Sequence, residues 1–270
     1  MSSLLYGAHV HANGIRQHYL RYGGYGRPLL LIPGITSPAI TWGFVAERLA
    51  EHLDVYTLDV RGRGLSESGN HLDYDLDAYA RDAEDFIAAL ALENCVVLGH
   101  SMGARIAVRL ARTAPSSLGR AILVDPPVSG PGRRRYPAKL DWYVDSIRLS
   151  LRGMGVDEMR EFCPTWSEEQ LRLRAEWLHT CNEIAVRETF ERFHTEDMHS
   201  DLPLVSCPAL LVAATRGDVI KPEDEAEILA LCPGLSAVRV PEAGHMIPWD
   251  NLEGFLEAVV PFATSGCGSA

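Results

Sequence analysis

The chain has 270 residues, and at roughly 150 residues per domain this length allows one large domain or two small ones with a sizeable core. Hydrophobic residues make up 47% and charged residues 23%, which excludes a disordered chain and a coiled coil. The formal net charge of −11 argues against nucleic acid and membrane surfaces as partners. It also opposes a small anionic substrate, unless the site supplies its own positive charge.

The six cysteines form neither a C-x-x-C pair nor a His/Cys cluster at metal-ligand spacing, so the sequence predicts no metal site. The amino-terminal residues contain no basic region followed by a long apolar run, and no stretch of ~18 apolar residues occurs elsewhere. We therefore expect a soluble, cytoplasmic protein with free thiols.

The first predicted elements are two strands near residues 8–12 and 16–21, in which polar and apolar residues alternate. They meet at Asn13-Gly14, a pair typical of tight turns, and so predict an antiparallel hairpin at one edge of a sheet. The later strands are short apolar runs, as is typical of parallel strands buried on both faces. These runs are residues 28–32, 55–59, 95–98, 121–124 and 209–213.

Helical patterns separate these strands. Apolar residues recur every three or four positions over residues 75–92. A further helix is predicted over 104–114, where Arg105, Arg109 and Arg112 indicate a solvent-facing side. This alternation of strands and helices predicts an α/β fold, with a mostly parallel doubly wound sheet and an antiparallel amino-terminal edge.

The alternation stops after Pro126. Residues 127–202 contain no buried strand and show loops and amphipathic helices, which predicts a helical cap inserted into the α/β domain. The domain itself then comprises residues 1–126 and 203–263, and the sheet pattern resumes at Cys207-Pro208. The small residues of 264–270 predict a flexible tail.

The segment Gly99-His-Ser-Met-Gly103 has the pattern G-x-S-x-G between a predicted strand and a predicted helix. In this context the serine lies on a sharp, strained turn that exposes its hydroxyl, and the glycines allow neighbouring backbone to approach closely. We therefore predict that Ser101 is a nucleophile.

A serine hydroxyl needs a general base within hydrogen-bond reach. His245 follows the last predicted strand and precedes the last helix, which puts it at the same sheet edge as Ser101. His100 is next to Ser101 but is expected to point away from the turn. The acid of a Ser-His-Asp triad has two candidates, Asp125 and Asp218, because each ends a predicted strand and both fit the chain order Ser…Asp…His.

Four segments together resemble the α/β-hydrolase family, and the resemblance covers nearly the whole chain. They are Leu31–Gly34, Asp59–Ser66, Gly99–Gly103 and Gly244-His245. The resemblance implies an α/β-hydrolase fold in which the backbone amides of Ile35 and Met102 form the oxyanion hole. A serine at the turn, where dehalogenases and epoxide hydrolases have aspartate, implies acyl chemistry.

The segment Pro33–Trp42 and the short cap further resemble the N-formylmaleamate deformylases of bacterial nicotinate degradation. This resemblance implies a hydrolase that uses no cofactor and cleaves N-formylmaleamate to maleamate and formate. Ser101 would attack the formyl carbonyl, His245 would return the proton to the departing nitrogen, and water would release formate from a formyl-serine. The resemblance also favours Asp125 over Asp218 as the acid.

We expect the substrate to be a small dicarboxylate, which needs local cations in a chain of this negative charge. Arginine suits bidentate carboxylate binding, and Arg133, Arg134 and Arg135 in the predicted cap are the candidates. Trp42 and Trp249 lie next to the predicted oxyanion and histidine loops, and so are candidates for the substrate-binding wall.

Two other interpretations fit the same residues. A carboxylesterase, an enol-lactonase or a carbon–carbon hydrolase of aromatic catabolism would use the same constellation of nucleophile, base and acid. A non-catalytic receptor with the hydrolase fold would bind a small ligand under the cap and retain the triad without turnover.

Overall fold

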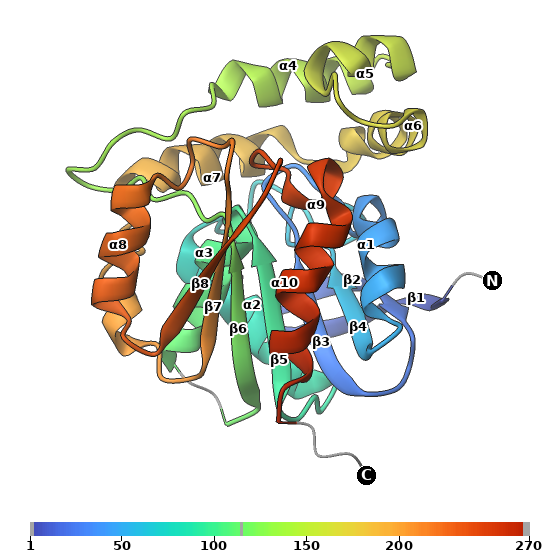
Figure 1. Ribbon diagram of the computed structural model, residues 1–270. Helices are drawn as coiled ribbons and strands as arrows, with labels where there is room; N and C mark the ends of the chain where they lie inside the picture. Colours follow the sequence, from blue (N-terminus) through green and yellow to red (C-terminus); the bar gives the residue numbers. More distant parts are fainter. Residues whose placement is uncertain (1–2, 114–115, 267–270) are drawn as a thin grey trace.

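The computed structural model describes residues 3–113 and 116–266, and its centre is one eight-stranded sheet with the order β1-β2-β4-β3-β5-β6-β7-β8 (Figure 1). The strands are β1 (Leu4–Ala12), β2 (Ile15–Tyr22), β3 (Arg27–Ile32), β4 (Leu53–Leu58), β5 (Cys95–His100), β6 (Leu118–Val124), β7 (Ala209–Ala214) and β8 (Leu235–Val240). Strand β2 pairs antiparallel with β1 and with β4, and the other pairs are parallel. The predicted α/β sheet with an antiparallel amino-terminal edge is therefore confirmed.

Helices cover both faces of this sheet (Figure 1). Helices α1 (Gly43–Leu49) and α10 (Leu252–Thr264) pack on one face, and α2 (Leu76–Ala89), α3 (Met102–Thr113) and α8 (Pro222–Leu231) pack on the other. Because side chains alternate along a strand, Leu29 and Leu31 of β3 face the first layer while Leu30 and Ile32 face the second. Covering both faces explains why the strands are nearly continuous apolar runs.

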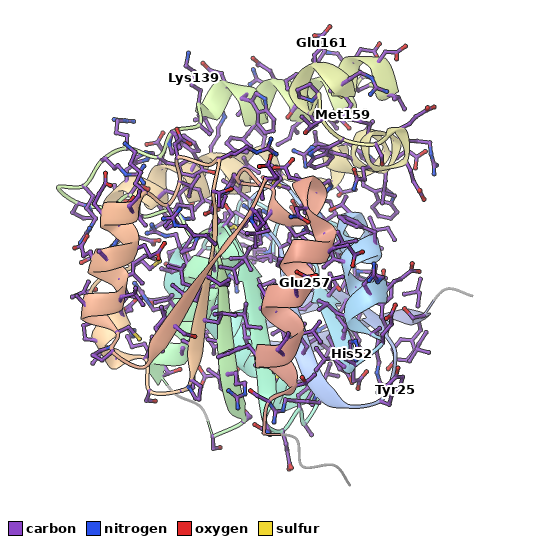
Figure 2. The ribbon with its side chains drawn as sticks, in the orientation of Figure 1. Tyr25, His52, Lys139, Met159, Glu161 and Glu257 are labelled. Atoms are coloured by element: carbon purple, nitrogen blue, oxygen red, sulfur yellow. The ribbon has the colours of Figure 1, made fainter. Side chains whose placement is uncertain are left out.

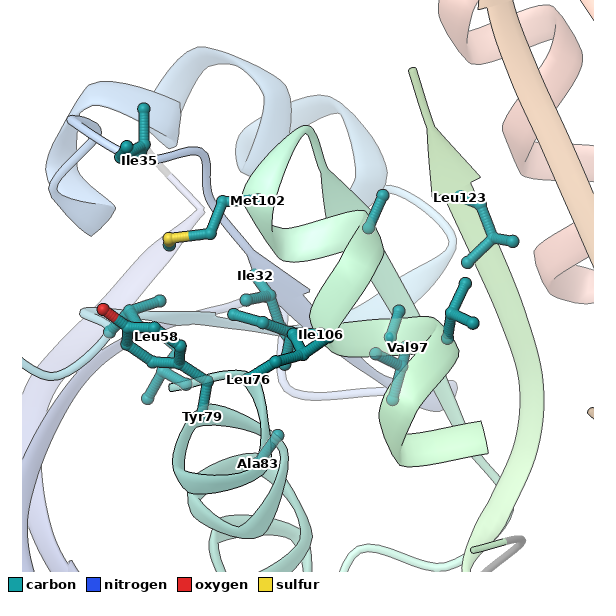
Figure 3. Close-up of a cluster of buried hydrophobic side chains, with 14 of the residues drawn as sticks. Ile32, Ile35, Leu58, Leu76, Tyr79, Ala83, Val97, Met102, Ile106 and Leu123 are labelled. Atoms are coloured by element: carbon teal, nitrogen blue, oxygen red, sulfur yellow. The ribbon is translucent and has the colours of Figure 1, made fainter. Parts of the chain in front are cut away.

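Figure 3 shows part of the second apolar layer. Val97 and Leu123 from the sheet meet Ile106 of α3, and Leu76 and Tyr79 extend from α2 into the same cluster. All five side chains are almost completely buried. This packing fixes α3 against β5, and the first residue of α3 follows the predicted nucleophile directly.

Four helices between β6 and β7 lie across the carboxyl ends of the strands, and we name them the cap layer (Figure 1). They are α4 (Leu140–Ser150), α5 (Val156–Phe162), α6 (Glu168–Trp177) and α7 (Glu183–Thr195). Figure 2 shows Met159 and Glu161 in this layer and Lys139 directly before α4, far from Tyr25 and His52 at the opposite end of the sheet. Met159 is fully buried and Glu161 is exposed, as expected for an amphipathic helix.

The remaining elements are short and connect the larger ones. They are the 3-10 helices η1 (Ala39–Trp42), η2 (Leu178–Thr180) and η3 (Leu202–Leu204) and the one-turn helix α9 (Ile247–Asp250). Helix α10 continues to Thr264, and residues 267–270 of the predicted tail lie outside the described residues. In the described ranges, no helix is long and apolar enough to span a membrane.

The prediction that α3 presents a solvent-facing arginine side was wrong for Arg105. This side chain is 1% exposed, and its guanidinium donates to three backbone carbonyls, those of Pro127, Ser129 and Glu196. Arg109 forms an ion pair with Asp201 at 2.5 Å. The chain segments before and after the cap layer therefore cover this side of α3, and Arg105 holds both of them.

The contact between α3 and β3 requires glycine at position 103. A Cβ atom there would lie 2.0 Å from the Ile32 carbonyl oxygen, a distance that no side chain can occupy. The obstructing atom belongs to backbone in the middle of the sheet, so it cannot move without displacing β3. The second glycine of the G-x-S-x-G pattern is therefore a packing requirement.

We predict that Gly103→Ala lowers the free energy of unfolding by about 3 kcal/mol, because the added methyl group forces α3 away from β3. Urea denaturation followed by circular dichroism measures this change. Gly234→Ala is the matched control, since a Cβ there meets no atom within 4 Å. Equal stability of the two variants would contradict the packing argument.

Candidate active site

Ser101 lies on the turn between β5 and α3 in a left-handed backbone conformation, with φ of 54°. Such a conformation is strained for a residue with a side chain and persists only where the surroundings hold it. Here the Ser101 amide donates to the Val124 carbonyl of β6 at 2.8 Å, and a Cβ at Gly99 would lie 2.0 Å from the Gly103 carbonyl oxygen. The turn therefore exposes the Ser101 hydroxyl at the carboxyl edge of the sheet.

His245 links Ser101 to Asp125. His245 Nε2 lies 3.0 Å from Ser101 Oγ, and His245 Nδ1 lies 2.7 Å from Asp125 Oδ2. Asp125 is fully buried at the end of β6, where its Oδ1 also accepts the Ala214 amide at 3.4 Å. An imidazole protonated at Nδ1 donates to the carboxylate and leaves Nε2 free to accept the serine proton.

The second acid candidate, Asp218, lies elsewhere. It is exposed in the loop beyond β7, where it lines a second cavity with Lys139. His245 also lines this cavity, but no hydrogen bond joins Asp218 to His245 in the described part of the chain. The structure therefore brings Asp125 to His245 and leaves Asp218 at the outer surface.

The two predicted oxyanion amides lie on either side of the turn. Met102 begins α3, so its amide has no acceptor within the helix and lies at the positive end of the helix dipole. Ile35 lines the cavity above Ser101, and the buried Arg63 holds the Ile35 carbonyl through a 3.0 Å hydrogen bond from Nε. The Met102 side chain points into the apolar layer, near Ile35 (Figure 3).

His100 contacts the His245 loop. Its Nε2 donates to the His245 carbonyl at 2.9 Å, and its ring packs at 4.9 Å from the His245 ring and 5.3 Å from Trp42. Burial lowers the pKa of His100 to about 3, so the ring stays neutral over the working range of pH. The loop is held from its other side by the Gly244 amide, which donates to Asp250 at 2.7 Å.

Tyr136 reaches the same centre, and sequence reasoning missed it. Its Oη lies 3.2 Å from His245 Nε2 and 3.4 Å from Tyr143 Oη, and it also contacts the Ser101 hydroxyl. Burial raises the pKa of Tyr136 well above its ordinary value, so the side chain is a neutral phenol. No motif surrounds it, and its only signal is an aromatic residue directly after the three consecutive arginines.

A cavity of about 250 Å³ lies above Ser101 and His245. Its floor is formed by the turn and the histidine loop, and its upper walls come from the cap layer. The wall residues of the cap layer and the segment before α6 include Trp142, Phe162, Cys163, Trp166 and Arg174. The cavity is therefore an aromatic chamber with one guanidinium and one carboxylate, that of Asp250, in its wall and a serine hydroxyl in its floor.

Comparison with known families decides the classification. Residues 27–252 match the α/β hydrolase fold family. The chain belongs to this family. The fold and the family resemblance predicted from the four sequence segments are thereby confirmed.

The hydrolase has close relatives in Pseudomonas putida. It is 61% identical over 262 residues, which are 97% of its own length and 98% of the relative's, to N-formylmaleamate deformylase of strain KT2440. The crystal structure of N-formylmaleamic acid deformylase from strain S16 matches it with a TM-score of 0.91 and 60% identity, covering 94% of this chain and all of that one. E-2-(acetamidomethylene)succinate hydrolase shares the fold at 22% identity, with a TM-score of 0.78 over 96% of this chain and 98% of that one.

The three consecutive arginines of the hydrolase do not line its cavity, contrary to prediction. Arg133 forms two hydrogen bonds to Glu227, at 2.7 and 2.8 Å, and Arg134 pairs with Asp224 at 2.5 Å. Arg135 is exposed. The carboxylates of α8 attract this loop, as expected in a chain with an excess of acidic residues. A run of consecutive arginines therefore need not indicate a binding site for an anion.

The two predicted pocket tryptophans form a second row behind the cavity wall. Trp42 is fully buried and packs edge-on against Trp249, with ring centroids 4.8 Å apart. Trp249 in turn stacks on Trp166 at 4.9 Å. Trp42 and Trp249 therefore lie near the site, as their proximity in the sequence to the oxyanion and histidine loops predicts, but neither lines the cavity.

We predict that Asp125→Asn lowers kcat of the hydrolase about 10⁴-fold, because the amide cannot hold His245 in the tautomer that accepts the serine proton. Steady-state kinetics measures this loss. Asp218→Asn removes an exposed carboxylate of the same type and is expected to change kcat less than about 2-fold. The reverse pattern would show that Asp218 is the acid.

The buried His100 should make the stability of the hydrolase depend on pH. Its pKa falls from 6.5 to about 3 on folding, so the unfolded chain binds more protons between these values. The free energy of unfolding then decreases by about 2 kcal/mol from pH 8 to pH 5 through this group alone. Urea denaturation at both pH values should show a smaller decrease for His100→Gln than for the wild type, and parallel decreases would contradict this.

Proposed function

We propose that this hydrolase cleaves N-formylmaleamate to maleamate and formate without a cofactor, with Ser101, His245 and Asp125 as its triad. The observation that carries the proposal is a hydrogen-bonded Asp–His–Ser chain, with contacts of 2.7 and 3.0 Å, in a protein 61% identical to N-formylmaleamate deformylase. Among the described residues, no group of three or more His, Cys, Asp or Glu side chains is arranged to bind a metal ion.

The first half-reaction forms a formyl-enzyme. Ser101 Oγ attacks the formyl carbon while His245 Nε2 accepts the hydroxyl proton, and Asp125 stabilises the resulting imidazolium. The amides of Ile35 and Met102 donate to the oxyanion of the tetrahedral intermediate. His245 then returns the proton to the departing nitrogen, the carbon–nitrogen bond breaks, and maleamate leaves.

The second half-reaction consumes water. His245 removes a proton from a water molecule, which attacks the formyl carbon of the ester on Ser101. The second tetrahedral intermediate collapses, Ser101 regains its proton from His245, and formate leaves. One water is added for each amide bond broken.

The formyl group has no side chain, so the acyl side of the site needs very little space. Tyr136 Oη contacts both Ser101 and His245, and Ile35 covers the turn from the loop after β3. These contacts leave the larger aromatic chamber for the maleamate part. The arrangement therefore fits a small acyl group joined to a larger leaving group.

The expected charge of the substrate needs one correction. Maleamate is the monoamide of a dicarboxylic acid, so N-formylmaleamate has one carboxylate, and the expectation of a dicarboxylate counted one anionic group too many. One cation near Ser101 is then sufficient. We further propose a cytoplasmic location, which is favoured by the five free thiols of the described chain.

We predict that the wild-type protein releases formate and maleamate from N-formylmaleamate in equal amounts, and that Ser101→Ala lowers kcat about 10⁶-fold. A coupled formate dehydrogenase assay measures turnover, and circular dichroism checks that the variant is folded. Turnover of p-nitrophenyl acetate without turnover of N-formylmaleamate would indicate a carboxylesterase. Full activity of Ser101→Ala would overturn the assignment of the nucleophile.

A further inference from the structure

The guanidinium of Arg174 is buried in the cavity wall without a counterion. Arg174 comes from α6 and is 3% exposed, and in the described ranges no carboxylate oxygen lies within ion-pair distance of it. Arginine keeps its charge in proteins, so it cannot become neutral on burial as a lysine can. An unpaired buried charge is costly, which indicates that a negative group joins it when the cavity is occupied.

The partners that Arg174 does have are neutral. Its Nη1 and Nη2 donate to the carbonyl oxygen and Oγ1 of Thr36, both at 3.1 Å. Its guanidinium carbon lies 5.8 Å from the centre of the Trp142 ring and 5.5 Å from that of Trp166. The Cys163 thiol also contacts the guanidinium. The two rings lie next to the cation and Thr36 holds one edge, but none of these groups supplies a negative charge.

One edge of the guanidinium includes a donor that has no acceptor among the described residues. Thr36 accepts one hydrogen bond from Nη1 and one from Nη2, at the outer end of the guanidinium. The Nε atom of Arg174 is buried without a partner in the described structure. The unused edge presents Nε–H and the second Nη2–H side by side. This is the pair of donors that binds the two oxygens of a carboxylate.

The other buried arginines differ from Arg174. Arg61 pairs with Asp82 at 2.5 Å. Arg63 and Arg105 donate to several carbonyl and hydroxyl groups of the protein, and neither lines the cavity. Among the described residues of the cavity wall, Arg174 is the one arginine or lysine.

We propose that Arg174 binds the substrate carboxylate through Nε and Nη2, at the end of the cavity away from the formyl group. The proposal rests on the proposed deformylation for the identity of the substrate. Thr36 directly follows Ile35, so Arg174 also holds the loop that carries the proposed oxyanion amide, and this fixes the anion site relative to Ser101. Only a substrate with an anion at the matching distance then holds its formyl group over Ser101.

Binding in the Ser101→Ala background tests this site without turnover. Isothermal titration calorimetry measures Kd for N-formylmaleamate, for maleamate and for maleamide, the neutral diamide that lacks the carboxylate. We expect Arg174→Gln to weaken binding of both anions at least about 30-fold and to change the Kd of maleamide much less. Arg174→Lys keeps the charge but loses the paired donors. Its Kd for the anions should therefore lie between the Kd with Arg174 present and the Kd of Arg174→Gln.

A matched control removes a charge from the same helix. Arg172 is exposed and pairs with Glu176 at 3.1 Å, so Arg172→Gln should change the Kd of either anion less than about 2-fold. Thermal unfolding of each variant shows whether α6 remains packed. Equal weakening of anion and diamide binding by Arg174→Gln would show that Arg174 only supports the wall, and an unchanged anion Kd would overturn the proposal directly.

The outcomes also separate this inference from the proposed function. If wild-type protein fails to release formate but maleamate binding still depends on Arg174, the anion site stands and the substrate is another carboxylate. If formate is released and the KM for N-formylmaleamate is the same in Arg174→Gln as in the wild type, the deformylase function stands and the inference about Arg174 is wrong.

Discussion

The hydrogen bond between Asp125 and His245 is the interaction on which the site depends. It joins the end of β6 to the loop after β8 with a contact of 2.7 Å between Nδ1 and Oδ2. In the proposed mechanism this bond selects the tautomer of His245 and thereby allows Nε2 to accept a proton from Ser101. Asp125 is fully buried, and its position is set by the parallel pairing of β6 and β7. The order of strands in the sheet therefore determines which carboxylate lies next to His245.

Buried arginines connect the cap layer to this edge. Arg105 holds the segments that enter and leave the cap layer, and Arg63 joins the Ile35 carbonyl to Thr189 of α7. Arg174 holds Thr36 from α6. Each of these side chains offers several donors in a fixed plane, so one residue can hold two or three backbone segments together. The loop with the proposed oxyanion amide is therefore gripped from both the core and the cap layer.

Sequence patterns predicted the parts of the site that follow predicted strands. The G-x-S-x-G turn and His245 could be located because each follows a predicted strand, and the carboxyl ends of parallel strands meet at one edge. The choice between Asp125 and Asp218 stayed open on residue pattern alone, since both aspartates follow strands. Only the geometry shows that Asp125 faces His245 while Asp218 is displaced into an exposed loop.

The cavity wall could not be predicted in the same way. The prediction chose Arg133, Arg134 and Arg135 for their local charge density, whereas the carboxylates of α8 neutralise the first two and the third is exposed. Arg174 is one of several charged residues in a helix with no distinctive pattern, and Tyr136 lies in a loop. Whether such a side chain is neutralised or left unpaired depends on residues far away in the chain.

The sequence by itself determined the α/β class, the antiparallel edge, the nucleophile turn and the candidate base, because these follow from local periodicity and from glycine requirements within a few residues. The tertiary structure decided which acid meets the base, which aromatic rings face the cavity, and which arginine remains without a counterion. These are properties of packing between segments that the chain separates by dozens of residues. No local sequence pattern predicts these properties, because burial and charge pairing depend on how the cap layer packs on the sheet.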